Sequence, residues 1–213
     1  EECVYFMTWI TIPLTLASTA TTFMLPEVSG AEAIGNITEA KEKIDKATWL
    51  SMFISIPCAV GLFVLAGPVT SLLFPATDGV AGHLMMIGVV TVIMNGMSNI
   101  STGVLQGIGK ANLPMIHAAV AQAVDIVLMV ALMFATDLGI YSIPIAMIAY
   151  ALVMCILNHL SMRKALNYRN PWKEAYLKPF LASLPMGAAA FLIYRGVYYF
   201  SSSIPGGILI ALI

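Results

Sequence analysis

Residues 101–116, STGVLQGIGKANLPMI, join two long apolar segments and contain three glycines, one lysine and one proline. The Gly109–Lys110 pair resembles the end of a phosphate-binding loop, in which the backbone N–H groups of glycines hold a phosphate. Such a loop also needs a glycine five residues before its Gly-Lys pair and a serine or threonine after it. This chain has Val104 and Ala111 at those positions. The stretch is therefore not predicted to bind a nucleotide.

The composition of the whole chain indicates a membrane protein. Of its 213 residues, 60% are hydrophobic and only 10% are charged, and the mean hydropathy is +0.91. Soluble domains carry about a quarter charged residues, so this chain lacks the charge to cover a surface in water. Apolar runs of about 20 residues match a hydrocarbon core roughly 30 Å thick. We predict an all-α, polytopic transmembrane helical bundle, because a lipid-exposed span must satisfy its backbone internally and no alternating barrel strands occur.

The apolar runs predict six complete membrane spans and a seventh that is cut short. They lie at about residues 3–25, 49–74, 82–105, 114–135, 141–162 and 177–200, with the last from 204 onward. The chain begins Glu-Glu-Cys and stops within an apolar run. We therefore expect it to be part of a longer protein.

Basic residues mark one side of the membrane. Nine of the ten lysines and arginines lie in three alternate connections, at 26–48, 106–113 and 163–178, whereas the other side has only Arg195. The positive-inside rule places these three connections in the cytoplasm. The chain is therefore predicted to be a multi-pass protein of the cytoplasmic, or inner, membrane. Its net charge of −1 gives no reason to expect a nucleic-acid partner.

The first basic connection is predicted to contain a helix that leads into the second span. Asn36 and Glu39 have the spacing of a capping box at a helix start. Glu39 with Lys43, and Glu42 with Lys46, have the spacing of ion pairs one helical turn apart.

The third predicted span carries a polar stripe. Its members share one side of a helix and are candidates for lining a transport cavity: Asn95, Asn99, Thr102 and Gln106. A second stripe of small residues, about 100° round the same helix, is formed by Gly96, Gly103 and Gly107. Small residues let helices approach closely in a membrane, so the glycines are expected to pack against a neighbouring helix. The polar stripe would then face either another helix, through hydrogen bonds, or an aqueous cavity.

The fourth predicted span places Asp125 near its middle, with Gln122 one turn earlier. An ionised carboxylate at that depth costs roughly 2.5–3.5 kcal/mol on insertion scales. Asp125 is the candidate for coupling transport to a proton or another cation, and Gln122 is a further cavity candidate. The alternative is a structural hydrogen bond from Asp125 to another helix, for example to the polar stripe. His117 is expected at the cytoplasmic interface of the same span.

No catalytic, cofactor-binding or metal-binding pattern is present in the sequence. Serine, histidine and aspartate show no triad arrangement, and no paired histidines or carboxylates lie at ligand spacing. The three cysteines, Cys3, Cys58 and Cys155, are scattered through apolar segments and are expected to be packing residues. We therefore expect no catalytic residues, metal or cofactor. A transporter is favoured over a membrane-embedded transferase of envelope synthesis.

Three stretches resemble a known superfamily, and they occur in its order. They are FMLPEVSGAEAIGNITEAKEKI at 23–44, SIPCAVGLFVLAGPVTSLLF at 55–74 and TGVLQGIGKANLPMI at 102–116. Each resembles an element of the multidrug/oligosaccharidyl-lipid/polysaccharide flippase superfamily. The chain looks most similar to the branch of stage V sporulation protein B and related polysaccharide and lipid II flippases.

The resemblance implies a fold of two six-helix lobes with extra helices at the C-terminus. Residues 1–162 would form most of the second lobe of this MATE-like fold, at about helices 8 to 12. Residues 163–213 would form a cytoplasmic basic linker and two extra helices, about 13 and 14. Asp125 stands where similar sequences are expected to have asparagine.

The function implied by the resemblance is a flippase that works by alternating access. The substrate would be a lipid-linked oligosaccharide, either a polysaccharide repeat unit or a peptidoglycan precursor, with a proton or sodium as a coupling ion. The alternative within the superfamily is a cation-coupled multidrug exporter.

Overall fold

The computed structural model describes residues 2–73, 80–136, 139–168 and 173–203. The elements are α1 (Glu2–Ala33), α2 (Ile37–Leu73), α3 (Val80–Gly88), α4 (Val90–Gly107), α5 (Asn112–Ala135), η1 (Gly139–Tyr141), α6 (Ser142–Leu166), η2 (Lys173–Leu177) and α7 (Lys178–Ser203). Here η1 is a 3₁₀ turn and η2 a short π-helix. No strand occurs among the described residues, which confirms the predicted all-α class.

Five segments of the described chain are long and apolar enough to cross a membrane. They are Ile37–Pro68, Gly82–Gly107, Asn112–Ala135, Gly139–Leu166 and Lys173–Gly196. These five coincide with the second to sixth predicted spans and confirm a polytopic helical bundle. The first predicted span, 3–25, lies within the 32-residue helix α1, which is not among the five. The truncated span from 204 onward lies outside the described residues.

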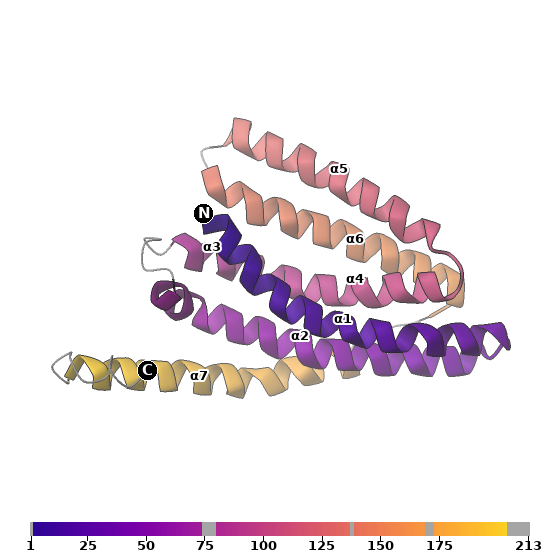
Figure 1. Cartoon of the computed structure of the whole chain (residues 1–213), viewed down its shortest axis with the longest axis horizontal. Coiled ribbons are helices and arrows are strands. Elements are labelled where there is room, and N and C mark those ends of the chain that lie inside the picture. The colour runs from indigo at the N-terminus through magenta and orange to yellow at the C-terminus, as the bar shows by residue number, and fades with distance from the viewer. Residues whose placement is uncertain (1, 74–79, 137–138, 169–172, 204–213) are drawn as a thin grey trace.

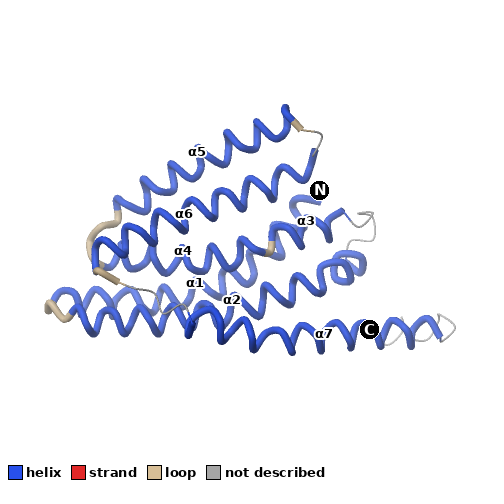
Figure 2. The backbone as a smooth tube through the Cα atoms, turned by 180° about the vertical axis from the view of Figure 1, so that it is seen from behind, coloured by secondary structure: helices blue, strands red, loops and turns tan. Residues whose placement is uncertain are grey.

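The helices form an elongated bundle with α4 near its centre (Figure 1). Helices α5 and α6 pair at one edge, α7 runs along α2 at the opposite edge, and α1 packs on both α2 and α4. In the reverse view α1 lies behind α2 and α4 (Figure 2). The α1–α2 turn, the α4–α5 turn and the end of α6 all lie at one end of the bundle. These are the connections in which basic residues were predicted to gather on a single side.

The third predicted span, 82–105, lies within the single candidate span Gly82–Gly107, which has a one-residue irregularity at Val89 between α3 and α4. Helix α3 ends at Gly88 and α4 begins at Val90. The Thr91 hydroxyl donates a 2.6 Å hydrogen bond to the carbonyl of Gly88. The Val92 N–H donates a hydrogen bond to the carbonyl of Val89. Val89 itself keeps helical dihedrals, with φ −60° and ψ −26°, so the helical path continues from α3 into α4.

The connection predicted at 26–48 is a helical hairpin, and the helix expected within it is the first part of α2. Helix α1 continues to Ala33 and α2 begins at Ile37. Gly35 makes the turn with a φ of 73°, a left-handed conformation that glycine adopts without steric cost. Hydropathy falls in this region because it leaves the lipid, and not because the helices end.

The predicted capping box forms, but the predicted ion pairs do not. The Glu39 N–H donates to Asn36 Oδ1 at 3.2 Å, and Asn36 Nδ2 donates to Glu39 Oε2 at 2.9 Å. Lys43 pairs with Glu27 of α1 at 3.3 Å instead of with Glu39. No ion pair between Glu42 and Lys46 occurs in the described part of the chain. Antiparallel packing of α1 on α2 brings Glu27 within reach, which spacing along one helix does not reveal.

The glycine stripe of α4 allows close approach to two helices. A Cβ atom added to Gly103 would lie 2.3 Å from Thr21 Cγ2 of α1, and one added to Gly107 would lie 3.2 Å from Ser29 Oγ. At Gly96 the added atom would lie 2.7 Å from Ser55 Oγ of α2. The expectation of close packing is confirmed, with α1 and α2 sharing the stripe.

The turn between α4 and α5 explains the remaining glycine of residues 101–116. Gly109 has a φ of 73°, and the Lys110 N–H bonds the carbonyl of Leu105 at 2.8 Å. This is the geometry of a glycine-terminated helix end, which satisfies carbonyls that the helix leaves free. Pro114 lies in the first turn of α5, where a missing N–H costs nothing. The stretch is thus a hairpin between two membrane helices. This agrees with the connection predicted at 106–113 and with the failure of the phosphate-loop pattern.

Tyr168 fastens the chain that leaves α6 to the start of α2. Asn167 ends α6 in a left-handed conformation with a φ of 48°. Tyr168 then enters a core cluster that contains Ile44 and Met162. Its hydroxyl donates a 2.5 Å hydrogen bond to Asp45 Oδ1. Burial, together with this bond and the negative charge of Asp45, raises the pKa of the Tyr168 hydroxyl.

We expect Tyr168→Phe to lower the free energy of unfolding by about 1.5–3 kcal/mol, the range for a hydrogen bond to a charged acceptor. Below about pH 10 the hydroxyl is protonated in both states, so its contribution is constant. Above that pH the unfolded chain releases the proton first, and stability falls by about 1.4 kcal/mol per pH unit. Unfolding in detergent micelles at neutral and alkaline pH measures both effects.

The matched control for this prediction is Tyr150→Phe on α6. It is expected to keep the alkaline loss of stability that Tyr168→Phe abolishes. An unchanged pH dependence in Tyr168→Phe would contradict the role given to the Tyr168–Asp45 bond.

Candidate functional site

Helix α4 carries the predicted polar stripe, and the structure divides it into a bonded and an open part. Thr102 lies on the side that faces α6, where its Oγ1 accepts a 2.9 Å hydrogen bond from Asn158 Nδ2. Asn95, Asn99 and Gln106 fall between the side that faces α6 and the glycine side that faces α1. Asn95 and Asn99 are partly exposed and Gln106 is exposed. Among the described residues, none of these three side chains has a hydrogen-bond partner.

The bonded part belongs to a buried network that joins three helices. Asn158 of α6 is fully buried, and its Nδ2 also donates to Ser98 Oγ at 3.1 Å. Its Oδ1 lies 2.7 Å from His117 Nδ1 of α5, and Ser161 Oγ lies 3.2 Å from His117 Nε2. Asn158 thereby links α4 to α5 at a depth where water cannot replace lost partners.

The hydrogen-bond pattern assigns the protons of this network. The amide hydrogens of Asn158 are donated to Ser98 and Thr102. Its Oδ1 must therefore accept a hydrogen bond from His117 Nδ1–H. The Ser161 hydroxyl lies within hydrogen-bonding distance of His117 Nε2 and can donate to it or accept from it. Both ring nitrogens of His117 therefore have a partner.

His117, expected at the cytoplasmic interface, lies in the second turn of α5, next to the basic connection. Its side chain is 9% exposed and packs between α5 and α6. Asn158, Ser98 and Ser161 were not predicted to contribute to a site. One signal was available, because Asn158 is the sole carboxamide in the predicted span 141–162.

Asp125 and Gln122 lie apart from the α4 stripe. Gln122 Nε2 donates a 3.1 Å hydrogen bond to Asp125 Oδ2, so the described partner of the carboxylate is on its own helix. Helix α5 packs chiefly on α6 and borders the bundle edge, where Gln122 is exposed and Asp125 partly exposed (Figure 1). The suggested hydrogen bond from Asp125 to the polar stripe of α4 is therefore not formed.

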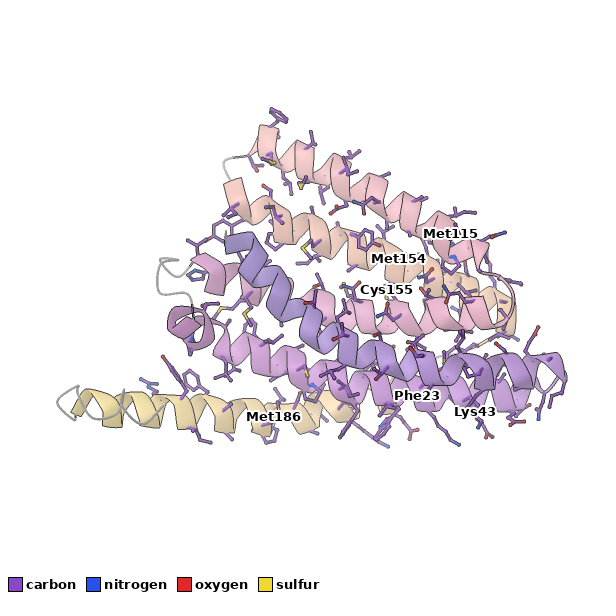
Figure 3. The ribbon with its side chains drawn as sticks, viewed as in Figure 1. Phe23, Lys43, Met115, Met154, Cys155 and Met186 are labelled. Carbon is purple, nitrogen blue, oxygen red and sulfur yellow. The ribbon has the colours of Figure 1, made fainter. Side chains whose placement is uncertain are left out.

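The other side of α4 is apolar. Met94 and Met97 line a cavity of about 430 Å³ with Cys155 of α6 and Tyr176 of η2. Figure 3 shows Cys155 between α6 and α4, and Cys155 is a free thiol in this apolar setting, as expected of a packing residue. Helix α4 thus separates an apolar surface from a surface with unpaired carboxamides.

The open carboxamides can donate and accept hydrogen bonds but carry no charge. No group of three or more histidine, cysteine or acidic side chains at metal-binding spacing occurs in the described ranges. The site can therefore bind polar, uncharged groups such as hydroxyls and amides. Among the described residues, no nucleophile–base pair lies around this site.

These features define a multi-pass helical membrane protein with a polar surface at membrane depth. The chain belongs to the family described as lipid II flippase MurJ, whose profile matches residues 7–212. This membership confirms the predicted flippase superfamily. The family is described by its name as one of flippases, which does not favour the multidrug exporter.

A curated relative supports the same family. The chain is 32% identical over 72 residues to a probable lipid II flippase MurJ of Rhizobium meliloti (strain 1021). That match covers 31% of this chain and 14% of the relative, so the chain matches only a small part of the relative's length. No solved structure matches the chain.

Proposed function

We propose that the whole protein flips a lipid-linked peptidoglycan precursor across the cytoplasmic membrane by alternating access. Residues 1–162 would supply most of the second lobe, at about helices 8 to 12, and residues 163–213 the basic linker and two extra helices. The observation that carries the proposal is the pair of unpaired, partly exposed carboxamides of Asn95 and Asn99 within a membrane span. Family membership supports the class of substrate.

The energetics of the bilayer support a polar, water-accessible environment for this pair. A polar side chain in hydrocarbon without a partner costs several kcal/mol on scales that allow no hydrogen bonding, or about 1–3 kcal/mol from protein data. Thr102 avoids that cost through Asn158, but Asn95 and Asn99 have no such bond. A hydrated cavity, or a sugar and peptide headgroup passing through it, would supply the missing partners.

We expect the double variant Asn95→Ala/Asn99→Ala to slow translocation about tenfold. Two lost hydrogen bonds to a headgroup are worth about 1–3 kcal/mol, and about 1.4 kcal/mol corresponds to tenfold. Thermal stability should hardly change, because neither side chain is bonded within the described bundle. The assay is translocation of a fluorescent lipid-linked sugar by the whole protein in vesicles.

The matched control is Asn112→Ala, which removes an exposed carboxamide at the start of α5. It should translocate at the unaltered rate. Equal rates for the control and the double variant would remove the α4 surface from the transport path. Absence of lipid-linked sugar translocation by the unaltered protein, with ion-driven efflux of cationic drugs, would refute the flippase itself.

We further propose that Asp125, with Gln122, contributes to ion coupling by a proton or sodium. The support is a carboxylate near the middle of α5 whose described hydrogen-bond partner is the neutral Gln122. Asp125→Asn keeps the shape of the side chain and its ability to form hydrogen bonds but removes the charge. We expect this variant to fold normally and to lose the dependence of translocation on pH or sodium. Unchanged dependence on both would exclude Asp125 as the coupling residue.

A further inference from the structure

A second cavity, of about 460 Å³, lies between α2 and η2. This volume is within the range of about 300–1,000 Å³ that small-molecule sites occupy. The cavity, called here the interfacial pocket, is lined by Asp45, Lys46, Trp49, Leu50, Glu174 and Ala175. None of these residues belongs to the α4 surface or to the Asn158 network.

The interfacial pocket lies where its two walls pass from charged to apolar sequence. After Lys46 the next charged residue is Asp78, and after Lys178 the next is Arg195. Trp49 sits at this boundary, is 44% exposed and stacks on Phe53 with ring centroids 5.0 Å apart. Tryptophan is enriched at the level of lipid headgroups. The pocket is therefore at the depth of the headgroups of the cytoplasmic leaflet.

Charges of both signs converge on this pocket. The Asp45 carboxylate is held by the Tyr168 hydroxyl, and the Glu174 carboxylate pairs with Lys178 at 3.1 Å. Lys46 has no ion pair with any described residue. Two carboxylates and one free ammonium disfavour a purely anionic ligand. They complement a ligand that carries an ammonium and a phosphate a few bonds apart.

We propose that the interfacial pocket binds the phosphoethanolamine headgroup of a bilayer lipid. The primary ammonium donates to Asp45 and Glu174 and lies near the ring of Trp49, which attracts cations. The phosphate pairs with Lys46. The acyl chains run over apolar side chains that leave the pocket toward the membrane and are 43–55% exposed: Leu50, Phe53, Leu177 and Leu181.

This lipid would brace η2 against α2 and is distinct from any transported substrate. The proposed lipid site can therefore be tested independently of the proposed flippase activity. Its selectivity follows from hydrogen bonding. A phosphocholine headgroup has the same charges but no N–H groups to donate to Asp45 and Glu174, so it should bind more weakly.

The test uses the whole protein in nanodiscs of phosphatidylcholine that contain a small fraction of phosphatidylethanolamine or phosphatidylglycerol. Native mass spectrometry then reports which lipid stays bound. We expect about tenfold enrichment of phosphatidylethanolamine over both other lipids, which corresponds to about 1.4 kcal/mol. Glu174→Gln and Lys46→Gln should each reduce the enrichment at least threefold. Both residues have exposed side chains, so the fold should persist.

The matched controls are Glu42→Gln and Lys41→Gln, which change charge on the same stretch of α2 but do not line the pocket. They should leave the enrichment unaltered. Equal retention of the three lipids, preference for phosphatidylglycerol, or the same loss in the control variants would overturn the proposal. Displacement of the bound lipid by millimolar soluble phosphoethanolamine would also overturn it, because the proposed ligand is held by its chains as well as its headgroup.

Discussion

Gly103→Ala is expected to lower the free energy of unfolding by about 2 kcal/mol, although alanine is the better helix former. Helix propensity alone favours alanine over glycine by about 1 kcal/mol. The added Cβ would lie 2.3 Å from Thr21 Cγ2, and a methyl group close to the α1 backbone cannot swing away as the end of a long side chain can. Helices α1 and α4 must therefore separate, and overpacking of this kind costs about 1–3 kcal/mol or more.

The contact is specific enough to be tested by compensation. Thr21→Ser removes Cγ2, after which the nearest remaining atom of that side chain to the added Cβ is Thr21 Cβ, at 3.7 Å. The double variant Gly103→Ala/Thr21→Ser should regain at least half of the lost stability. Gly30→Ala on α1 is the control, because an added Cβ there meets nothing within 4 Å.

Equilibrium unfolding in detergent micelles measures all four proteins under one condition. Gly30→Ala should be neutral or slightly stabilising, since only helix propensity changes there. A Gly103→Ala variant as stable as the Gly30→Ala control would show that α1 and α4 do not approach as closely as described.

The spans and turns of this bundle are predictable from sequence because lipid leaves few alternatives for the backbone. Five predicted spans match segments of the structure, and the turn at Gly109 follows from a glycine flanked by apolar runs. The glycine stripe also predicts that α4 packs closely. Spacing along a helix defines a side but not a neighbour, so the division of that stripe between α1 and α2 was not predictable.

The ends of helices outside the membrane are less accessible to such reasoning. Hydropathy indicates where a helix leaves lipid, and the charged residues after Pro26 were therefore assigned to a connection. Helix α1 nevertheless continues to Ala33, and its end is set by the left-handed Gly35. The irregularity at Val89 likewise lies within a continuous apolar run, which gives no sign of it.

The candidate site was predicted in part, for a related reason. Periodicity placed Asn95, Asn99 and Thr102 on one side of α4, but it did not show that Thr102 alone finds a partner. That distinction depends on Asn158, which lies 56 residues further along the chain. For Asp125 the sequence suggested a hydrogen bond to the polar stripe of α4. The helix that carries it lies at the edge of the bundle, away from α4.

Asn158→Leu is expected to lower the free energy of unfolding by roughly 2–3 kcal/mol. Leucine has the same branched arrangement of heavy atoms, although it is larger, and it leaves three former partners without their bonds: Ser98, Thr102 and His117. Hydrogen bonds between membrane helices contribute about 0.6 kcal/mol on average and up to about 1.7 kcal/mol. The buried ring N–H of His117 adds a desolvation cost of about 1–3 kcal/mol once it is unpaired. The readout is equilibrium unfolding in detergent micelles.

Asn95→Leu is the matched control. It makes the same chemical change on α4, at a carboxamide that has no hydrogen bond to any described residue. It should alter stability by less than about 0.5 kcal/mol, as substitutions away from packed or bonded features do. A double-mutant cycle then separates the network from simple packing. Combining Asn158→Leu with His117→Leu removes the orphaned ring, so the double variant should be less destabilised than the sum of the two single variants by at least about 0.5 kcal/mol. Additive losses, or an Asn158→Leu variant as stable as the Asn95→Leu control, would contradict a network in which Asn158 holds α4, α5 and α6 together.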